Sequence, residues 1–343
     1  MIPERITTDA ELDDALITPS EADIATLSQL PGDVIIIGAG GKMGPTLATR
    51  LRRAADAAGH ARRVFAASRF SDPVARQGLE RDGVQTIACD LTDRAQIAAL
   101  PSCDHVLYLA GRKFGTSNRS DLTWFTNTVV PAYVVERFST ARFVAFSTGN
   151  VYPLVPATSN GSKESDPPQP VGEYAQSCLG RERVVEYASH ERGTPALLFR
   201  LNYAVDLRYG TLMDIARRVH AGEPVDLTVG WLNAIWQGDA NSYAIRSLSL
   251  CSSPAAVLNV TGPERVSVRE VATWFGRELG SPVRFVGSEG SVALLSDASR
   301  CIELLGPPDV SLQQLVAWAA HWVRIGGATL NKPTHFEVAD GRF

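Results

Sequence analysis

The chain has 343 residues, of which 45% are hydrophobic, and its 33 basic and 37 acidic residues give a net charge of −4. This length and apolar content can bury a large core and suit two closely packed lobes. No basic block interleaved with aromatic residues occurs, so nucleic acids and anionic membrane surfaces are poor candidate partners.

Cysteine and histidine usage indicates neither a metal site nor a disulfide framework. The five cysteines have no CxxC spacing, and the six histidines form no HxxxH pair or Cys/His cluster. No apolar segment follows Met1–Arg5, and no apolar run approaches the roughly 20 residues that a membrane span needs. We therefore expect a reduced, cytoplasmic protein that does not contact a membrane.

The first 200 residues carry the pattern of an α/β protein. Residues 1–32 form an acidic N-terminal extension with one short helix at Glu21–Leu30, which Ser20 can cap and Pro31 can end. Short β-branched runs separated by helical stretches then follow at Val34–Gly38, Val64–Ser68, Val84–Ala88, His105–Leu109, Phe143–Ser147 and Ala196–Arg200. This alternation predicts a doubly wound parallel Rossmann sheet over residues 33–200.

The alternation loosens after residue 200, which predicts a smaller substrate-binding lobe over residues 201–328 with some elements returning to the sheet. Helices are expected near Thr211–Ala221, Ser267–Leu279 and Ser311–Ile325, and a strand at Val257–Val260. The segment Pro153–Pro170 is rich in Pro, Ser and Gly and is expected to form a loop over the site. Residues 329–343 are polar and predict a C-terminal tail.

A glycine-rich turn directly follows the first predicted strand. It contains Gly38, Gly40, Gly41 and Gly44, and a predicted helix begins after it. Glycines in this context let backbone N–H groups approach a pyrophosphate, and the helix N-terminus adds partial positive charge. The flanking strand and helix favour a dinucleotide-binding turn, including Lys42 and Met43, over an ordinary glycine-rich loop.

The end of the second strand indicates which dinucleotide is bound. An acidic residue there would select NAD, but the strand ends at Ser68 and Arg69. An Arg beside a hydroxyl can hold a 2′-phosphate, and Lys42 can add a second cation. NADP(H) is therefore preferred over NAD(H). If Arg69 and Lys42 are solvated surface charges, the choice stays open.

Further motifs occur in order along residues 33–325. They are the glycine turn, Asp90-Leu91, Tyr108–Gly111, Asn127, Phe146–Tyr152, Tyr174–Glu182, Leu258–Glu264 and Asp297–Gly306. Together they resemble the extended short-chain dehydrogenase/reductase family, which includes the NAD(P)-dependent sugar epimerases and dehydratases. The glycine turn is similar to the GxxGxxG motif of that family.

The resemblance implies a role for each matching residue. Asp90 and Leu91 would contact the adenine, and Asn127 would help to fix the site. The turn Leu109, Ala110 and Gly111 would lie beneath the nicotinamide ribose. Thr148 would orient the substrate, and Tyr174 would pass a proton to or from a substrate oxygen while hydride moves at the nicotinamide.

Two motifs depart from the family. The turn at Tyr108–Gly111 lacks the family His, which is a tolerated variation, and the YxxxK motif reads Tyr174…Cys178. Ser177 and Glu182 keep their usual offsets, so the Lys is replaced in place. A free phenol has a pKa near 10, which a neighbouring ammonium lowers. A neutral thiol is only a weak donor, and a thiolate would raise the pKa of Tyr174.

Three interpretations of this substitution stay open. Catalysis can persist, with Arg181, Lys163 or the positive nicotinamide supplying the missing charge. The protein can instead bind NADP(H) without turnover, as a regulator or an inactive partner subunit. Finally, Cys178 can itself be used, as a nucleophile or a ribose contact, although a buried cysteine commonly acts as a small hydrophobe.

The substrate and the assembly are less sharply indicated. Asn150, Asn202 and Tyr203 follow predicted strands at the expected substrate side, and Trp231 and Trp236 suit either sugar stacking or a core. No convergent set of arginines for a nucleotide diphosphate occurs, which favours an unmodified sugar, a sugar acid or another small polyol or ketone. Apolar residues on the helices at 121–139 and 174–190 predict a homodimer, as in the family.

Overall fold

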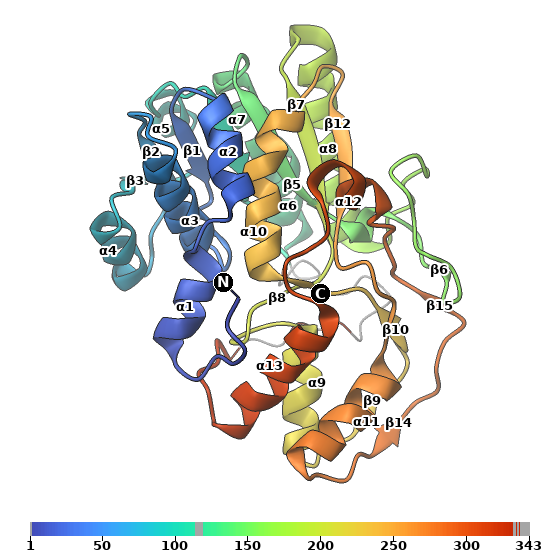
Figure 1. The fold of residues 1–343 in the computed structure, drawn as a ribbon. Helices are drawn as coiled ribbons and strands as arrows, with labels where there is room; N and C mark the ends of the chain where they lie inside the picture. The colour runs from blue at the N-terminus through green and yellow to red at the C-terminus, as the bar shows by residue number, and fades with distance from the viewer. Residues whose placement is uncertain (1, 114–118, 332–333, 335, 337–343) are drawn as a thin grey trace.

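The computed structural model describes residues 2–113, 119–331, 334 and 336, so most of the tail predicted at 329–343 lies outside the described residues. Seven parallel strands form one sheet in the order β12-β7-β5-β4-β1-β2-β3 (Figure 1). Their bounds are β1 Val34–Ile37, β2 Val64–Ser68, β3 Gln85–Ala88, β4 His105–Tyr108, β5 Arg142–Thr148, β7 Ala196–Leu201 and β12 Ala256–Val260. The predicted α/β fold with a parallel sheet is confirmed.

Both faces of the sheet are covered by helices. Alternate residues of β1 divide between two cores, because Val34 and Ile36 pack on one face and Ile35 and Ile37 on the other. One face carries α2 (Glu21–Gln29), α3 (Gly44–Ala57) and α10 (Gln237–Arg246), and the other carries α5 (Arg94–Ala98), α7 (Val130–Arg137) and α8 (Gly172–Arg192). All four β1 residues are fully buried, which explains their unbroken apolar run.

The N-terminal extension contains a helix, α1 (Asp9–Ile17), that the sequence analysis did not anticipate. Its start is a capping box, in which Thr8 accepts from the N–H of Glu11 and the Glu11 carboxylate accepts from the N–H of Thr8. Leu12 and Leu16 are fully buried in the core of the second lobe, whereas Leu27 of α2 packs in the core of the sheet. The extension therefore contacts both parts of the molecule.

The second lobe packs three helices around its own core: α9 (Thr211–His220), α11 (Val268–Leu279) and α13 (Leu312–Arg324). Two-stranded ladders complete it, formed by β8 (Ala204–Val205) with β11 (Ile235–Trp236), β9 (Val225–Asp226) with β14 (Phe285–Val286), and β10 (Trp231–Leu232) with β13 (Val266–Ser267). Trp236 is buried and packs edge-to-face on Trp318 at 5.3 Å between ring centroids, so it serves the core.

The remaining elements are short strands and helices in the connections between those described above. The predicted loop at 153–170 includes the short strand β6 (Val155–Pro156), which pairs with β15 (Val292–Ala293), and α12 (Ser299–Leu305) follows β15 along the chain. Helix α4 (Pro73–Arg81) lies between β2 and β3 in sequence. After the second lobe has begun, the chain returns to the sheet at β12, which pairs with β7.

The helix expected at 121–139 is interrupted. It consists of α6 (Ser120–Trp124), a π-helical turn at Phe125–Val129 and α7. Pro131 has no N–H to donate to the carbonyl of Asn127, and that carbonyl instead accepts from Nε of Arg181 at 3.3 Å. The interruption therefore presents a backbone acceptor to the neighbouring helix α8.

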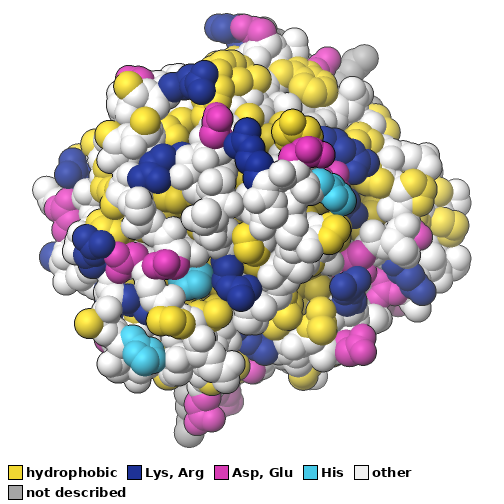
Figure 2. All heavy atoms as spheres, turned by 90° about the horizontal axis from the view of Figure 1, so that it is seen from above, with side chains coloured by type: hydrophobic (Ala, Val, Ile, Leu, Met, Phe, Trp, Pro, Cys, Tyr) yellow, Lys and Arg dark blue, Asp and Glu magenta, His cyan; other side chains and the backbone are white. Residues whose placement is uncertain are grey.

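The surface mixes both signs of charge. Figure 2 shows acidic and basic side chains interspersed among apolar ones on the face seen from above. Within the described part of the chain, no helix combines the length and the apolar character needed to cross a membrane.

Candidate cofactor pocket and acid/base corner

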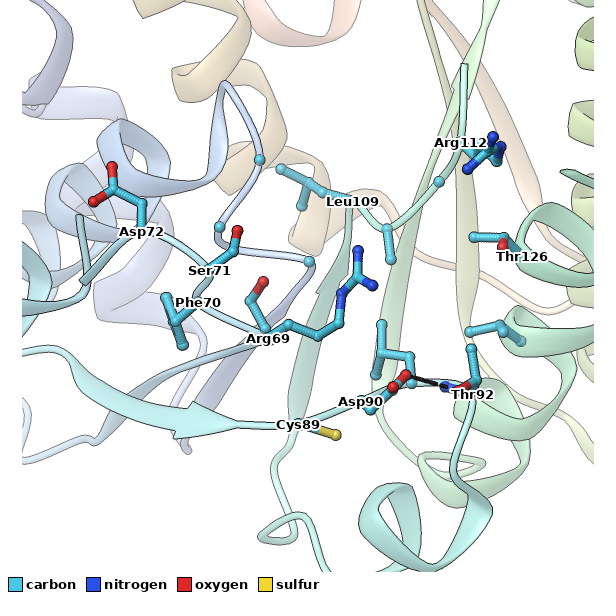
Figure 3. A pocket seen from close by; sticks show the side chains of 18 of the residues that line it. Arg69, Phe70, Ser71, Asp72, Cys89, Asp90, Thr92, Leu109, Arg112 and Thr126 are labelled. Atoms are coloured by element: carbon cyan, nitrogen blue, oxygen red, sulfur yellow. Dashed lines mark hydrogen bonds between the residues drawn. The ribbon is translucent and has the colours of Figure 1, made fainter. Parts of the chain in front are cut away.

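A pocket of about 390 Å³ lies at the carboxyl ends of β1, β2, β3 and β4 (Figure 3). The strand order reverses between β1 and β4, which is where open α/β sheets bind ligands. Ten residues predicted to bind the cofactor line this pocket: Gly38, Gly40, Gly41, Ser68, Arg69, Asp90, Leu91, Leu109, Ala110 and Gly111.

The glycines of the turn keep this space open. Gly38 has φ +86°, and a Cβ there would lie 2.6 Å from the N of Ala110. A Cβ on Gly40 would lie 2.6 Å from Oγ of Ser68, and one on Gly44 only 2.3 Å from the carbonyl oxygen of Ala39. A Cβ on Gly41 meets nothing closer than 3.4 Å. The turn thus fits a group that approaches the backbone closely, with Gly41 as its one tolerant position.

Two charged side chains, Arg69 and Asp90, line the pocket after the ends of β2 and β3. Figure 3 shows Arg69 extending from the end of β2 into the space between Leu109 and Asp90. Hydrogen bonds from the N–H and Oγ of Thr92, at 2.9 and 2.8 Å, lower the pKa of Asp90. Arg69 lowers this pKa further. Ser71 and Arg112 also line the pocket, and the sequence analysis did not anticipate either of them.

Two residues of the predicted turn lie elsewhere. Met43 precedes α3 and packs against the core of the sheet. The ammonium of Lys42 lies 3.2 Å from the ring centroid of Tyr209, a residue between β8 and α9 in the second lobe. Neither side chain lines the pocket described above.

Tyr174, Thr148 and Cys178 meet where the first turns of α8 face the end of β5. The Tyr174 hydroxyl makes hydrogen bonds with the side chains of both Thr148 and Cys178. Burial raises the pKa of Tyr174, and it also raises the pKa of the Cys178 thiol, whose residue is 1% exposed. A neutral phenol therefore lies beside a neutral thiol at neutral pH.

Asn127 joins the loop after β4 to α8. Its Oδ1 accepts from the N–H of Arg112 at 2.7 Å and from Nη2 of Arg181 at 3.0 Å. Its Nδ2 donates to the carbonyl of Arg112 and to Oγ of Ser177, both at 2.9 Å. Asn127 is fully buried with every polar position used, so it fixes the backbone of this loop.

The two cations considered for the missing lysine are held differently. Arg181 is 5% exposed and donates from Nη1 to the carbonyl of Phe146 at 2.7 Å, in addition to its bonds with Asn127. Its charge lowers the pKa of Tyr174, but its donors are directed at fixed acceptors. Lys163 is exposed on the loop that contains β6.

A third cation, Lys113, was missed by the sequence analysis. Its Nζ lies 6.0 Å from the ring centroid of Tyr174. The only sequence signal is that Lys113 follows Gly111 by two positions and is one of just four lysines in the chain.

A buried ion pair supports α8 beneath Tyr174, Thr148 and Cys178, the three residues of the candidate acid/base corner. Glu182 accepts from Nε and Nη2 of Arg200 at 2.9 and 2.7 Å and from Oγ of Ser147 at 2.5 Å. Arg200 also donates to the Tyr152 hydroxyl, which donates to Oδ1 of Asn259. Burial by itself would lower the pKa of Arg200. The hydrogen bonds and the charge of Glu182 outweigh this effect, so the pKa of Arg200 is raised. Glu182 thus serves as structural support.

The predicted substrate residues lie next to Thr148 or at the lobe boundary. Nδ2 of Asn150 donates to Oγ1 of Thr148 at 3.0 Å. Asn202 is 2% exposed, and its Nδ2 has no hydrogen-bond partner among the described residues. Tyr203 has φ +46° and packs against the core of the second lobe. Asn202 is therefore the one with unused hydrogen-bonding capacity.

A second pocket, of about 450 Å³, lies between the loop at 157–161 and the second lobe. Its lining includes Asn233, Asp297 and Ser299, and Arg265 is its one basic side chain among the described residues. The guanidinium of Arg265 donates to the carbonyl of Ala157 at 2.7 Å and lies 4.6 Å from the ring centroid of Trp231.

Comparison with known proteins agrees with this architecture. The sequence profile of the NAD dependent epimerase/dehydratase family matches residues 34–230. Pal from Bacillus thuringiensis has a similar structure, with a TM-score of 0.70 at 17% identity, over 85% of this chain and 99% of Pal. No curated protein sequence matches the chain significantly.

Two further solved structures are similar. The UDP-glucuronic acid 4-epimerase from Bacillus cereus, solved with NAD, has a TM-score of 0.68 at 17% identity, over 86% of this chain and 98% of its own. MoeE5, solved with UDP-glucose and NAD, has a TM-score of 0.68 at 21% identity, over 86% of this chain and 99% of its own. At these identities the likeness shows the fold.

Proposed function

The chain belongs to the NAD dependent epimerase/dehydratase family, whose profile matches more than half of its length, and from this premise we propose that it is a hydride-transfer enzyme. Its substrate would be a small sugar or a related keto or hydroxy compound. The observation that carries the proposal is the hydrogen bond between Tyr174 and Thr148 at the end of β5. The glycine turn lies at the same edge of the sheet.

The residues that would hold the cofactor are the glycine turn at the phosphates, Asp90 and Leu91 at the adenine, and Leu109–Gly111 near the nicotinamide ribose. When bound, the nicotinamide would take up hydride from the substrate carbon or return it. Arg69 supports NADP(H) over NAD(H), because it is a cation that extends into the pocket from the end of β2. MoeE5 and the Bacillus cereus 4-epimerase were both solved with NAD, so both dinucleotides belong in the test.

Thr148 and Tyr174 would divide the acid/base work. Oγ1 of Thr148 accepts from the N–H and Nδ2 of Asn150, at 3.2 and 3.0 Å, which leaves its one hydroxyl proton for the hydrogen bond with Tyr174. A bound substrate oxygen would replace Tyr174 as the acceptor of that proton. Tyr174 Oη would take the proton from the substrate hydroxyl during oxidation and return it during reduction. Asn202, with its unused Nδ2, would contact the substrate from the lobe boundary.

The second pocket supports an unmodified sugar, a sugar acid or a small polyol or ketone. A nucleotide diphosphate needs convergent cations, and Arg265 is the one basic side chain in the described lining, already bonded to a carbonyl. Nucleotide sugars are the competing class, since MoeE5 was solved with UDP-glucose and the Bacillus cereus protein is a UDP-glucuronic acid 4-epimerase.

We also propose a homodimer through α7 and α8. Exposed apolar side chains near these helices support this assembly, with Tyr187 62% exposed, Val171 55% exposed and Trp124 37% exposed. Light scattering at micromolar concentration is expected to give the mass of two chains. A monomer under these conditions would contradict the assembly.

The central experiment combines binding with turnover. Purified protein is titrated with NADPH and NADH and then assayed with keto sugars, sugar acids and nucleotide sugars. Tyr174→Phe is expected to lower kcat/KM by about a hundredfold while cofactor affinity changes by less than about threefold. Tight cofactor binding together with unchanged turnover in Tyr174→Phe, for every substrate, would overturn the catalytic role.

A non-catalytic NADP(H)-binding regulator is the second candidate. It is favoured by the neutral thiol at position 178 and by the raised pKa of the buried Tyr174. This candidate requires tight cofactor binding with no hydride transfer even in a single turnover. Chemical use of Cys178 has less support, because a thiol that is 1% exposed with a raised pKa is a poor nucleophile.

A further inference from the structure

Tyr174 has a cation near its ring that does not come from its own helix. Nζ of Lys113 lies 6.0 Å from the centroid of the Tyr174 ring, within the distance at which an ammonium interacts with an aromatic ring. Lys113 belongs to the loop after β4, which also lines the cofactor pocket through Gly111 and Arg112. The loop therefore delivers a positive charge to the place where the cofactor pocket meets α8.

The backbone next to Lys113 is held by hydrogen bonds of Arg112. Both backbone groups of Arg112 are held by the buried side chain of Asn127, the N–H at 2.7 Å and the carbonyl at 2.9 Å. Asn127 in turn donates to Ser177 on α8, one residue before Cys178. The backbone that carries Lys113 is thus tied to the helix that carries Tyr174.

One other cation acts on Tyr174, because the charge of Arg181 also lowers the pKa of Tyr174, but the donors of Arg181 are committed to fixed acceptors. On α8, Cys178 is a buried thiol, and Arg181 donates to Phe146 and Asn127. Glu182 is neutralised by its bidentate pair with Arg200, and the Glu173 carboxylate accepts from the indole of Trp124. From β4, the buried Tyr108 presents a neutral phenol whose pKa is raised by burial.

We propose that Lys113 is a positioning residue for proton transfer, whose ammonium stabilises the ionised form of Tyr174 in place of the lysine absent at position 178. This inference rests on the proposed function. An ammonium 6.0 Å from the ring centroid of a half-buried phenol favours the phenolate, because the medium between them has a low dielectric constant. Lys113 transfers no proton itself, and the proton moves between Tyr174 Oη and the substrate oxygen.

The effect has a definite pH dependence. Burial lowers the pKa of Lys113, and the interaction with Cys178 opposes this shift. Below its pKa, Lys113 is charged and makes Tyr174 easier to ionise. As the pH rises through the pKa of Lys113, the ammonium is lost and that assistance ends. Activity in the oxidative direction should therefore reach a plateau or fall at high pH in the native protein.

The direct test measures the ionisation of Tyr174 without any substrate. A fluorinated tyrosine with a lowered intrinsic pKa is incorporated, and the fluorine NMR signal of position 174 is assigned among the eight tyrosines by its loss in Tyr174→Phe. We expect Lys113→Met to raise the titration midpoint of this phenol by about one pH unit. Lys113→Arg should restore at least half of that shift, and the exposed Lys163→Met should leave the midpoint unchanged. An equal midpoint in Lys113→Met and the native protein overturns the proposal.

The second test uses turnover and separates this inference from the proposed function. Lys113→Met is expected to lower kcat/KM near pH 7 by about tenfold with little change in cofactor affinity. Adding Cys178→Lys to Lys113→Met should restore it, because the cation returns to α8. If the native protein transfers no hydride, the proposed function fails, whereas the fluorine titration still decides the role of Lys113. Should Lys113→Met not fold, Lys113→Gln replaces it in both measurements.

Discussion

The cofactor pocket and the acid/base corner are built by opposite means. The shape of the pocket depends on absent side chains, because Cβ atoms at Gly38 and Gly40 would each lie 2.6 Å from a neighbouring atom, and one at Gly44 would collide with the backbone of Ala39. The corner depends on side chains from different elements that meet at α8. The first arrangement is local in sequence, and the second exists only in the folded chain.

This difference shows that a backbone motif is more informative about the site than a single charged position. A run of glycines after a strand specifies its own geometry, and the structure places that geometry at the pocket. A positive charge near Tyr174 can come from any part of the chain that folds close to it. The absence of a lysine at position 178 therefore does not establish that the site lacks a cation. Lys113 lies 65 residues before Cys178, yet both contribute to the surroundings of Tyr174.

The strongest way to break the corner is to remove its support. Glu182→Ala leaves Arg200 as an uncompensated buried charge, and we expect the free energy of unfolding to fall by about 3–5 kcal/mol. Urea unfolding followed by circular dichroism measures this loss. Glu186→Ala is the matched control on the same helix, since its exposed partner Arg183 should make it cost less than about 1 kcal/mol. Equal losses in both variants would contradict the distinction.

The pocket can be broken by adding one carbon. Gly44→Ala forces a Cβ to within 2.3 Å of the carbonyl oxygen of Ala39, and we expect a loss of about 1–3 kcal/mol of stability together with weaker cofactor binding. Gly41→Ala has room for its Cβ and should stay within about 0.5 kcal/mol of the native protein. Thermal unfolding and fluorescence titration with NADPH measure the pair. A larger stability loss in Gly41→Ala than in Gly44→Ala would contradict the conclusion that only position 41 of the turn has room for a Cβ.

A charge change at the pocket sharpens the comparison. Arg69→Ala is expected to weaken NADPH binding by about tenfold, on the order of 1.4 kcal/mol, with little effect on NADH. Arg76→Ala, which removes an exposed partner of Glu80, is the control and should change neither affinity. If NADPH and NADH weaken equally in Arg69→Ala, then Arg69 does not discriminate between them.

The smallest effect is expected at Cys178 itself. If the charge in the corner comes from Lys113, then Cys178→Ala removes only a small buried side chain, and kcat should change by less than about threefold. Stability should fall by about 1 kcal/mol through lost packing with Val151 and Tyr152. Steady-state kinetics checks this, and loss of turnover with an intact fold would instead support chemical use of the thiol.

Much of the fold was predictable from the sequence because it follows local patterns. The strand at Val64–Ser68 is observed as predicted, and the other sheet strands lie within one residue of their predicted bounds at each end. Helix α1 was missed although Thr8 and Glu11 form a capping box, since its sequence is acidic and its apolar residues are only weakly periodic. The π-helical turn at Phe125–Val129 was missed because Pro131 also suits a helix start. Lys113 could not be predicted, because its proximity to Tyr174 depends on tertiary contacts.

The contact between Lys42 and Tyr209 can couple ligand binding at the glycine turn to ligand binding at the second lobe. A cation–π contact is worth about 0.5–2 kcal/mol, and this one joins the glycine turn to the second lobe. A phosphate that draws Lys42 from the ring must overcome that energy, and a ligand that displaces Tyr209 releases Lys42 for the phosphate. Linkage requires the two effects to be reciprocal, so each ligand would change the affinity of the other by the same factor, between about 2-fold and 30-fold.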